Sequence, residues 1–295
     1  MATWVIGDVH GMYDAFQGMI KNPEIKEDDT VILIGDIIDR GHDSCKMLKW
    51  AMENITPDGK YQMVLGNHED NIIQDYEEKI SSKYSRYTDD NDISVLDCHY
   101  HFDVYMYSMG FETVKSVKPF IEWFKTLPLY KKITVDKPDG KKQEYIIAHG
   151  WYTAKEYERD TFLWYRDIED LYRTFPKTIN PEDILSGNFI PDGFTEDFNS
   201  ALYNGAILIH GHTPVFCDNG YPCTAQAYKR QHSINIDTGA CFRGGKLTMI
   251  RLEDEKVLYA DRYGNVQIGK MYLEEDYKKE IQREYKKMSS EEVKE

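Results

Sequence analysis

Short runs of apolar residues, each bounded by polar or turn-forming residues, recur along this chain. Runs of this length and composition are typical of buried β-strands. They lie at residues 3–6, 31–34, 61–65, 145–148, 206–209 and 233–236. Helix-compatible stretches at residues 13–22, 44–53 and 70–79 follow the first three runs. This alternation predicts an α/β fold that begins with a βαβαβ unit.

The later part of the pattern adds a hairpin and a charged end. Residues 246–252 and 256–260 flank the acidic turn at 253–255, which predicts an antiparallel pair and therefore a mixed sheet system. Residues 81–124 are rich in Tyr, Asp and Ser without a clean period, so we expect a helical or loop insertion. We predict a single domain over residues 1–272 and a charged C-terminal helix or tail over 273–295. A docked surface helix is the preferred interpretation of that tail, and a partner-binding helix is the alternative.

Composition and charge narrow the function classes. The net charge of −15 opposes a phosphate backbone, so we expect no nonspecific binding to nucleic acid. The first residues form no basic leader, and no apolar stretch approaches the roughly 20 residues that cross a bilayer. We therefore expect a cytoplasmic protein that does not bind membranes. The five scattered cysteines predict neither a disulfide framework nor a thiolate metal site, and the oligomeric state stays open.

Polar side chains follow five of the apolar runs, where each predicted strand ends. They are Asp8, Asp36, Asn67, His149 and His212. Because ligands of open α/β sheets bind beyond the carboxyl ends of the strands, we expect these groups to converge. Carboxylate, imidazole and amide oxygen together suit Mn, Fe, Zn or Ni. Asp8 and His10 can coordinate one ion, and the Asp36 carboxylate can bridge this ion to a second one. Asn67, His149 and His212 can supply the remaining ligands of the second ion.

Each of these groups also has an ordinary structural alternative. A single Gly-Asp or Asn-His pair is most often a turn, and a single buried histidine is more often held by hydrogen bonds than by a metal. Three long motifs in order, each after an apolar run, argue against chance. They are Gly7-Asp8-Val9-His10-Gly11, Gly35-Asp36-Ile37-Ile38-Asp39-Arg40-Gly41 and Gly66-Asn67-His68-Glu69.

With these motifs, the sequence resembles the phosphoprotein phosphatase (PPP) family of calcineurin-like metallophosphoesterases. The resemblance runs from residue 3 to about residue 252 and is weakest between residues 70 and 143. Gly211-His212-Thr213-Pro214 and residues 236–240 are similar to motifs of its bacterial and bacteriophage branch. The resemblance implies two packed mixed β-sheets flanked by helices, with two divalent metal ions at the strand ends.

The resemblance also implies a set of metal ligands. They are Asp8, His10, Asp36, Asn67, His149 and His212. Manganese is the expected metal, and iron, zinc and nickel are alternatives that the same ligands accept. His210 is the rival of His212 in the motif His210-Gly211-His212-Thr213, and we interpret His210 as a residue that supports the ligands.

Further motif residues are expected to act on the phosphate group. By the resemblance, His68 protonates the leaving oxygen and Asp39 holds its imidazole. Arg40 binds the substrate phosphate with a planar fork of donors, and Asn67 also contacts it. A second phosphate-binding arginine is expected at Arg166. Its alternative is a salt bridge with a neighbouring acidic residue: Asp167, Glu169 or Asp170.

The predicted reaction is hydrolysis of a phosphomonoester by in-line attack of a water or hydroxide that bridges the two metals. Our main prediction is a Ser/Thr protein phosphatase acting on a phosphoprotein, which Asp39-Arg40 and Gly66-Asn67-His68-Glu69 favour. The alternative is a bis(5'-nucleosyl)-tetraphosphatase acting on dinucleoside polyphosphates. A third hypothesis is a metal-binding scaffold without activity. The stretch between His68 and His149 is expected to decide the substrate.

Overall fold

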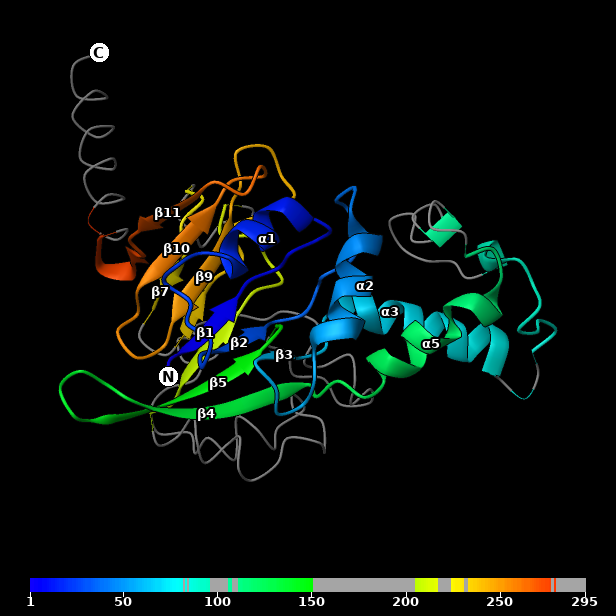
Figure 1. Ribbon diagram of the computed structural model, residues 1–295, viewed down its shortest axis with the longest axis horizontal. Helices are drawn as coiled ribbons and strands as arrows, with labels where there is room; N and C mark the ends of the chain where they lie inside the picture. Colours follow the sequence, from blue (N-terminus) through cyan, green and yellow to red (C-terminus); the bar gives the residue numbers. More distant parts are fainter. Residues whose placement is uncertain are drawn as a thin grey trace, which may run out of the picture.

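The computed structural model describes residues 1–81, 83, 85–95, 106–107, 111–150, 205–216, 224–230, 233–276 and 279. Over these residues the chain forms two six-stranded β-sheets packed on one another, with helices against the outer face of the first sheet (Figure 1). This arrangement confirms the predicted α/β fold of two mixed sheets flanked by helices.

The first sheet combines a parallel half with an antiparallel half. Its elements are β1 (Thr3–Ile6), α1 (Tyr13–Ile20), β2 (Thr30–Leu33), α2 (Ser44–Asn54), β3 (Tyr61–Met63), β9 (Leu247–Arg251), β10 (Val257–Ala260) and β11 (Val266–Gly269). The strand order is β11-β10-β9-β1-β2-β3. Strands β1, β2 and β3 are parallel, as the predicted βαβαβ unit requires. Strands β9 and β10 form the predicted antiparallel hairpin, and β11 extends it.

The second sheet brings together strands from the later part of the chain. They are β4 (Tyr130–Asp136), β5 (Lys142–Ala148), β6 (Ile207–His210), β7 (Tyr228–Lys229), β8 (Ser233–Asn235) and β12 (Tyr272–Leu273). The strand order is β12-β7-β8-β6-β5-β4. Strands β5, β6 and β8 are parallel to one another, so the three ends that follow them lie at one edge of the sheet.

Four strands are absent from the sequence prediction, and each lacks the signal that the prediction used. Strand β4 is an edge strand in which only Val135 is buried and two lysines interrupt any apolar run. Strand β11 is the edge strand of the first sheet, with Ile268 exposed to solvent. Strands β7 and β12 have two residues each, too few to show a period.

Alternate residues of the central strands face two different cores. On β1, Trp4 and Ile6 pack with the helices, whereas Val5 packs between the sheets in a cluster that includes Ile209 of β6. Because both faces are covered, these strands are continuously apolar in the sequence. The helix layer contains α1, α2, α3 (Asn67–Tyr76) and α5 (Val114–Phe124), with the short turns η1 (Glu77–Ser81) and η2 (Ile93–Val95) between the last two.

Helix α5 lies inside the stretch predicted as an insertion. It buries Val117, Ile121 and Phe124 in the core that also holds Trp4 of β1. This part of residues 81–124 therefore helps to build the core of the fold. Of the predicted C-terminal helix or tail, only residues 273–276 and 279 are described, so that division of the chain stays a prediction.

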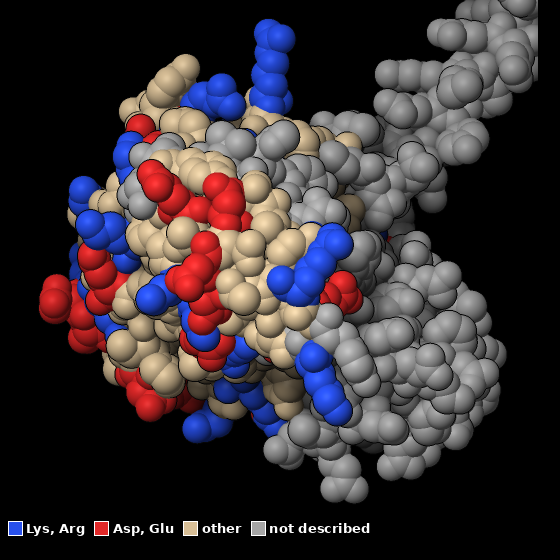
Figure 2. All heavy atoms as spheres, turned by 90° about the vertical axis from the view of Figure 1, so that its right-hand side faces the viewer, with Lys and Arg blue, Asp and Glu red and all other residues tan. Residues whose placement is uncertain are grey.

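Over the described part of the face shown in Figure 2, acidic and basic side chains are interspersed rather than gathered into one basic surface. Among the described helices, none combines the length and the apolar character needed to cross a membrane.

Candidate metal centre

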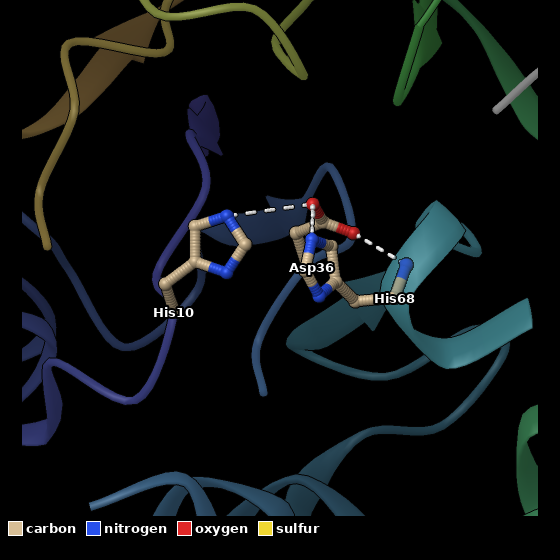
Figure 3. Close-up of side chains that lie close together, drawn as sticks. All are labelled: His10, Asp36 and His68. Carbon is tan, nitrogen blue, oxygen red and sulfur yellow. Dashed lines mark hydrogen bonds and ion pairs between the residues drawn. The ribbon is translucent and has the colours of Figure 1, made fainter. Parts of the chain in front are cut away.

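Asp36 lies at the centre of the predicted site, directly after β2, and its side chain is buried. Its Oδ2 atom lies 3.5 Å from His10 Nε2, 3.7 Å from His68 Nε2 and 3.4 Å from His149 Nε2. Figure 3 shows His10 and His68 pointing toward Asp36 from the loop after β1 and from the start of α3. Burial opposes the charge of Asp36, but the histidines, with His149 first, hold the pKa of this carboxyl well below its usual range.

The backbone around the site is strained. Five site residues adopt the left-handed conformation that L-residues rarely take: His10 (φ 44°), Asp36 (50°), Asp39 (67°), Arg40 (61°) and His212 (71°). Glu255 is the one other non-glycine residue of the described chain that does so. Each such residue costs on the order of 1–3 kcal/mol. The strained residues lie in the turns after the strands, and this backbone conformation directs their side chains toward one point.

A first group of ligating atoms gathers on the second-sheet side of Asp36. Asn67 Oδ1 lies 2.8 Å from His149 Nε2 and 2.8 Å from His212 Nδ1, and these two nitrogens lie 3.2 Å apart. His149 Nδ1 donates to the carbonyl oxygen of Ile34 at 2.9 Å, so a neutral His149 ring turns a lone pair toward the amide oxygen of Asn67. In the His212 tautomer with a bare Nδ1, three acceptors would face one another, and a cation between them would satisfy all three.

The pKa values in this group agree with that interpretation. Burial lowers the pKa of His212 to about 3, with His149 adding to the effect, so the His212 ring is neutral. Burial also acts to lower the pKa of His149, but the carboxylate of Asp36 outweighs it and the pKa is raised. A positive charge is therefore favoured at this point, whether a proton or a metal ion carries it.

A second group lies on the first-sheet side of Asp36. His10 Nδ1 donates to the carbonyl oxygen of Ile38 at 2.9 Å, and burial places the pKa of His10 well below its usual value. The neutral ring therefore presents the lone pair of Nε2 to the site. Here a cation is already present, because Arg40 Nη1 lies 2.8 Å from His10 Nε2.

Asp8 belongs to neither of these groups of close ligating atoms, and its charge is only partly compensated. It is buried, and its Oδ2 accepts a hydrogen bond from the backbone N–H of His212 at 3.1 Å. Its Oδ1 has no hydrogen-bond partner in the described structure. Burial, followed by the nearby carboxyls of Asp237 and Asp36, raises the pKa of Asp8. A buried carboxylate oxygen without a donor fits a site for divalent cations.

His68 forms a tight pair with Asp39. His68 Nδ1 donates to Asp39 Oδ2 at 2.6 Å, which turns the other nitrogen toward the site, 3.2 Å from Arg40 Nη2. Burial acts to lower the pKa of His68, but Asp36 and then Asp39 outweigh it and raise the pKa. A raised pKa and a carboxylate partner on Nδ1 are the features that general acid catalysis by a histidine requires.

Two buried carboxyls have no role in the sequence analysis. Glu69 Oε2 accepts hydrogen bonds from the backbone N–H groups of Asp36 (2.9 Å) and Gly66 (3.1 Å), and its Oε1 accepts from Ile37 (2.9 Å). Burial, followed by Asp36, raises the pKa of Glu69 to about 7. Asp237 accepts from the backbone N–H of Gly239 at 2.9 Å, and burial raises its pKa to about 6.

A sequence signal for Glu69 does exist. It occupies the third position of α3, where a capping-box glutamate reaches back to the N-cap, and the N-cap here is Gly66. The carboxylate therefore ties the start of α3 to the loop that carries Asp36. The motif containing Asp237 was recognised as part of the resemblance, but no chemical signal in it distinguishes a supporting carboxyl from a ligand.

Two glycines permit the close approach of these groups. A Cβ atom at Gly211 would lie 2.0 Å from Asp8 Oδ1, and one at Gly66 would lie 2.2 Å from the backbone nitrogen of Asp36. Both distances are shorter than any real contact. A side chain at Gly211 would therefore displace the Asp8 carboxylate, and one at Gly66 would displace the backbone of Asp36.

The remaining predicted residues have different outcomes. Arg166 lies outside the described residues, together with its alternative partners at 167, 169 and 170. His210 is buried on β6, where burial lowers its pKa to about 4 and its Nδ1 lies 3.3 Å from the carbonyl oxygen of Gly211. The groups able to hold a metal ion in the described part of the chain are His10, Asp36 and His68, and Asp36, His149 and His212.

The cysteine Cys241 lies beside Arg40, and its raised pKa argues against a role as a nucleophile. Burial raises the pKa of the Cys241 thiol to about 11, above the usual range for a thiol, although Arg40 opposes the shift. At neutral pH the group is therefore a thiol, whereas attack on phosphorus requires the thiolate.

Two packed mixed sheets with two groups of His and Asp side chains at their strand ends agree with the arrangement expected of a metal-dependent phosphoesterase. Residues 1–216 match the family model described as calcineurin-like phosphoesterase, and the chain belongs to this family. The resemblance stated above is thus confirmed at the level of the calcineurin-like metallophosphoesterases.

Curated relatives extend over most of the chain. The bis(5'-nucleosyl)-tetraphosphatase PrpE [asymmetrical] of Oceanobacillus iheyensis is 27% identical over 273 residues, covering 88% of this chain and 92% of the relative. The symmetrical bis(5'-nucleosyl)-tetraphosphatase of Salmonella arizonae is 25% identical, covering 87% of this chain and 93% of the relative. Among solved structures, a metallophosphoesterase from Sphaerobacter thermophilus matches with a TM-score of 0.43 and 13% identity, covering 92% of this chain and 88% of the other.

Proposed function

We propose that this protein hydrolyses dinucleoside polyphosphates such as diadenosine tetraphosphate. The observation that carries the proposal is the similarity to bis(5'-nucleosyl)-tetraphosphatases over about nine tenths of both chains. It favours the alternative of the sequence analysis over the main prediction of a Ser/Thr protein phosphatase. Both activities use the same chemistry at phosphorus and differ in the group that leaves.

The proposed ligands follow the two groups around Asp36. Asp8, His10 and Asp36 would hold one ion, and Asp36, Asn67, His149 and His212 the other. When bound, two such ions polarise phosphate oxygens and lower the pKa of a coordinated water. The ligand set accepts Mn, Fe, Zn and Ni, and manganese is the first metal to test.

Arg40 is proposed to bind the phosphate chain of the substrate. Its guanidinium lies between His10 Nε2 and His68 Nε2, at 2.8 and 3.2 Å. An ion held by His10 would take the place of the guanidinium there. Arg40 would then turn its planar fork to phosphate oxygens and leave His68 Nε2 free to donate a proton.

The Ser/Thr phosphatase remains a second candidate because of one observation. The His68–Asp39 pair is suited to protonate an alkoxide, which is a poor leaving group, whereas a nucleotide leaves as a stable phosphate anion. A site that cleaves only anhydrides has less use for such an acid.

Parallel assays with the Mn²⁺-loaded protein test the proposal. The substrates are diadenosine tetraphosphate, a phosphoserine peptide and p-nitrophenyl phosphate, each with a chelator control. We expect the highest kcat/KM for the dinucleotide. Products report the cleaved bond, since AMP with ATP means asymmetrical and two ADP means symmetrical cleavage. A higher kcat/KM for the phosphopeptide would support the second candidate, and silence on all three with bound metal would support a scaffold.

A further inference from the structure

Phe242 is an exposed aromatic ring at the border of the site. It lies in the turn between β8 and β9, and 38% of its surface is exposed, which places it among the few large apolar side chains exposed in the described chain. The guanidinium carbon of Arg40 lies over one face of the ring, 5.8 Å from its centre, so a ligand would stack on the other face. Because Arg40 also contacts His10 and His68, the ring stands beside the position proposed for the phosphate chain.

The ring is held in place rather than loosely attached. Phe216 packs perpendicular to it, with ring centres 5.8 Å apart and planes at 90°. Both rings lie over Gly239, where a Cβ atom would come within 2.4 Å of Phe216 and 3.2 Å of Phe242. The backbone N–H of Phe242 donates to the carbonyl oxygen of Gly239 at 2.9 Å, which closes the turn. A ligand that stacks on this ring would therefore lose little free energy in ordering it.

A fixed, exposed aromatic ring beside an anion-binding arginine suits a ligand that joins a flat apolar ring system to phosphate. Nucleotides have this composition, and stacking of a base on an aromatic side chain tolerates any base because every base has a π-face. We propose that Phe242, supported by Phe216, forms a stacking subsite for a nucleobase of the substrate. The inference rests on the proposed function for the identity of the substrate, but the subsite can be tested separately.

Binding of AMP and of ribose 5-phosphate to the Mn²⁺-loaded protein, measured by calorimetry, isolates the contribution of the base. We expect Phe242→Ala to weaken AMP binding about tenfold, the effect typical of a lost base–aromatic stack. Binding of ribose 5-phosphate should stay unchanged, and Phe242→Trp should retain the affinity for AMP. Tyr263→Ala is the matched control, because Tyr263 is 77% exposed and lies in the turn between β10 and β11.

Equal affinity of the wild type for AMP and ribose 5-phosphate would overturn the subsite. So would equal weakening of both ligands in Phe242→Ala, which would mean that the ring acts only through Arg40. Failure of the proposed function would give a different result. A protein that prefers AMP over ribose 5-phosphate but does not cleave diadenosine tetraphosphate would support the subsite and contradict the proposed substrate. Conversely, cleavage with an unchanged KM in Phe242→Ala would retain the function and reject the stacking.

Discussion

The two groups of ligating atoms on either side of Asp36 have the same kinds of side chain but are balanced differently. Around Asn67, His149 and His212, acceptors face one another and positive charge is drawn in through the raised pKa of His149. Around His10, the guanidinium of Arg40 supplies the positive charge and the histidine stays neutral. We therefore expect the first group to bind a cation in place of a proton on His149, and the second to exchange the guanidinium of Arg40 for an ion.

The largest effect is expected where the two groups meet. Asp36→Asn removes the charge that both share, so we expect loss of both ions and a fall in kcat/KM beyond the 10–100-fold typical of an outer supporting residue. Metal content per chain and kinetics measure this. Asp58→Asn, at an exposed position, is the control. Retention of one full equivalent of metal would show that the groups do not depend on a shared carboxylate.

His68→Asn tests the acid without removing a proposed ligand. We expect kcat for an alkyl phosphate to fall by about 10²–10⁴, the usual contribution of general acid catalysis. The fall should be much smaller for diadenosine tetraphosphate, because its leaving phosphate needs less protonation. Metal content should be unchanged. Loss of an ion in this variant would instead place His68 in the ligand group with His10 and Asp36.

The pH dependence of metal binding separates the two groups. In the metal-free protein the pKa of His149 is raised, so this ring becomes protonated as pH falls toward 6. An incoming ion must then displace that proton, and the metal affinity of this group drops. The lowered pKa of His10 means that its ring is neutral over the same range, so proton competition at that ring is absent. At the His10 group the competing acid is Asp8, whose pKa is raised. Calorimetric titrations between pH 6 and 8 should therefore show release of a histidine proton only at the His149 group, and affinity independent of pH at both sites would contradict the comparison.

The smallest effect is expected from Arg40→Ala measured as stability. Without the guanidinium, the lone pair of His10 and the nearby carboxylates lose their counter-charge, which costs about 1.5–3 kcal/mol for hydrogen bonds to charged groups. We expect a lower unfolding temperature in the chelator-treated protein and a smaller change in the Mn²⁺-loaded protein. An equal change in both states would mean that an ion does not replace Arg40.

The sequence predicts the strand ends well because both the apolar runs and the motifs mark them. Asp36 follows the second run and His68 opens the helix after the third, and the structure places them together. The sequence does not predict β4, because an edge strand exposes lysines where a central strand has apolar residues. The roles assigned to the site residues stay predictions until metal content and kinetics test them.

The positions of Phe242 and Glu69 in the site could not be predicted from sequence periodicity. A single aromatic residue in a turn belongs to no period, and its neighbour Phe216 is 26 positions away along the chain. Glu69 was visible as part of a motif, but its use depends on three backbone N–H groups that only the folded chain brings together.

The position of Asp36 depends on the carboxylate of Glu69, and therefore on the docking of α3. This carboxylate joins residues that are more than 30 positions apart, because it reaches from the first turn of α3 to the loop after β2. A nascent or partly unfolded chain in which α3 has not docked would present Asp36 in many orientations and bind metal weakly. Metal uptake can therefore serve as a reporter of correct docking, which would make metal retention after heating a sensitive assay of damage to this half of the fold.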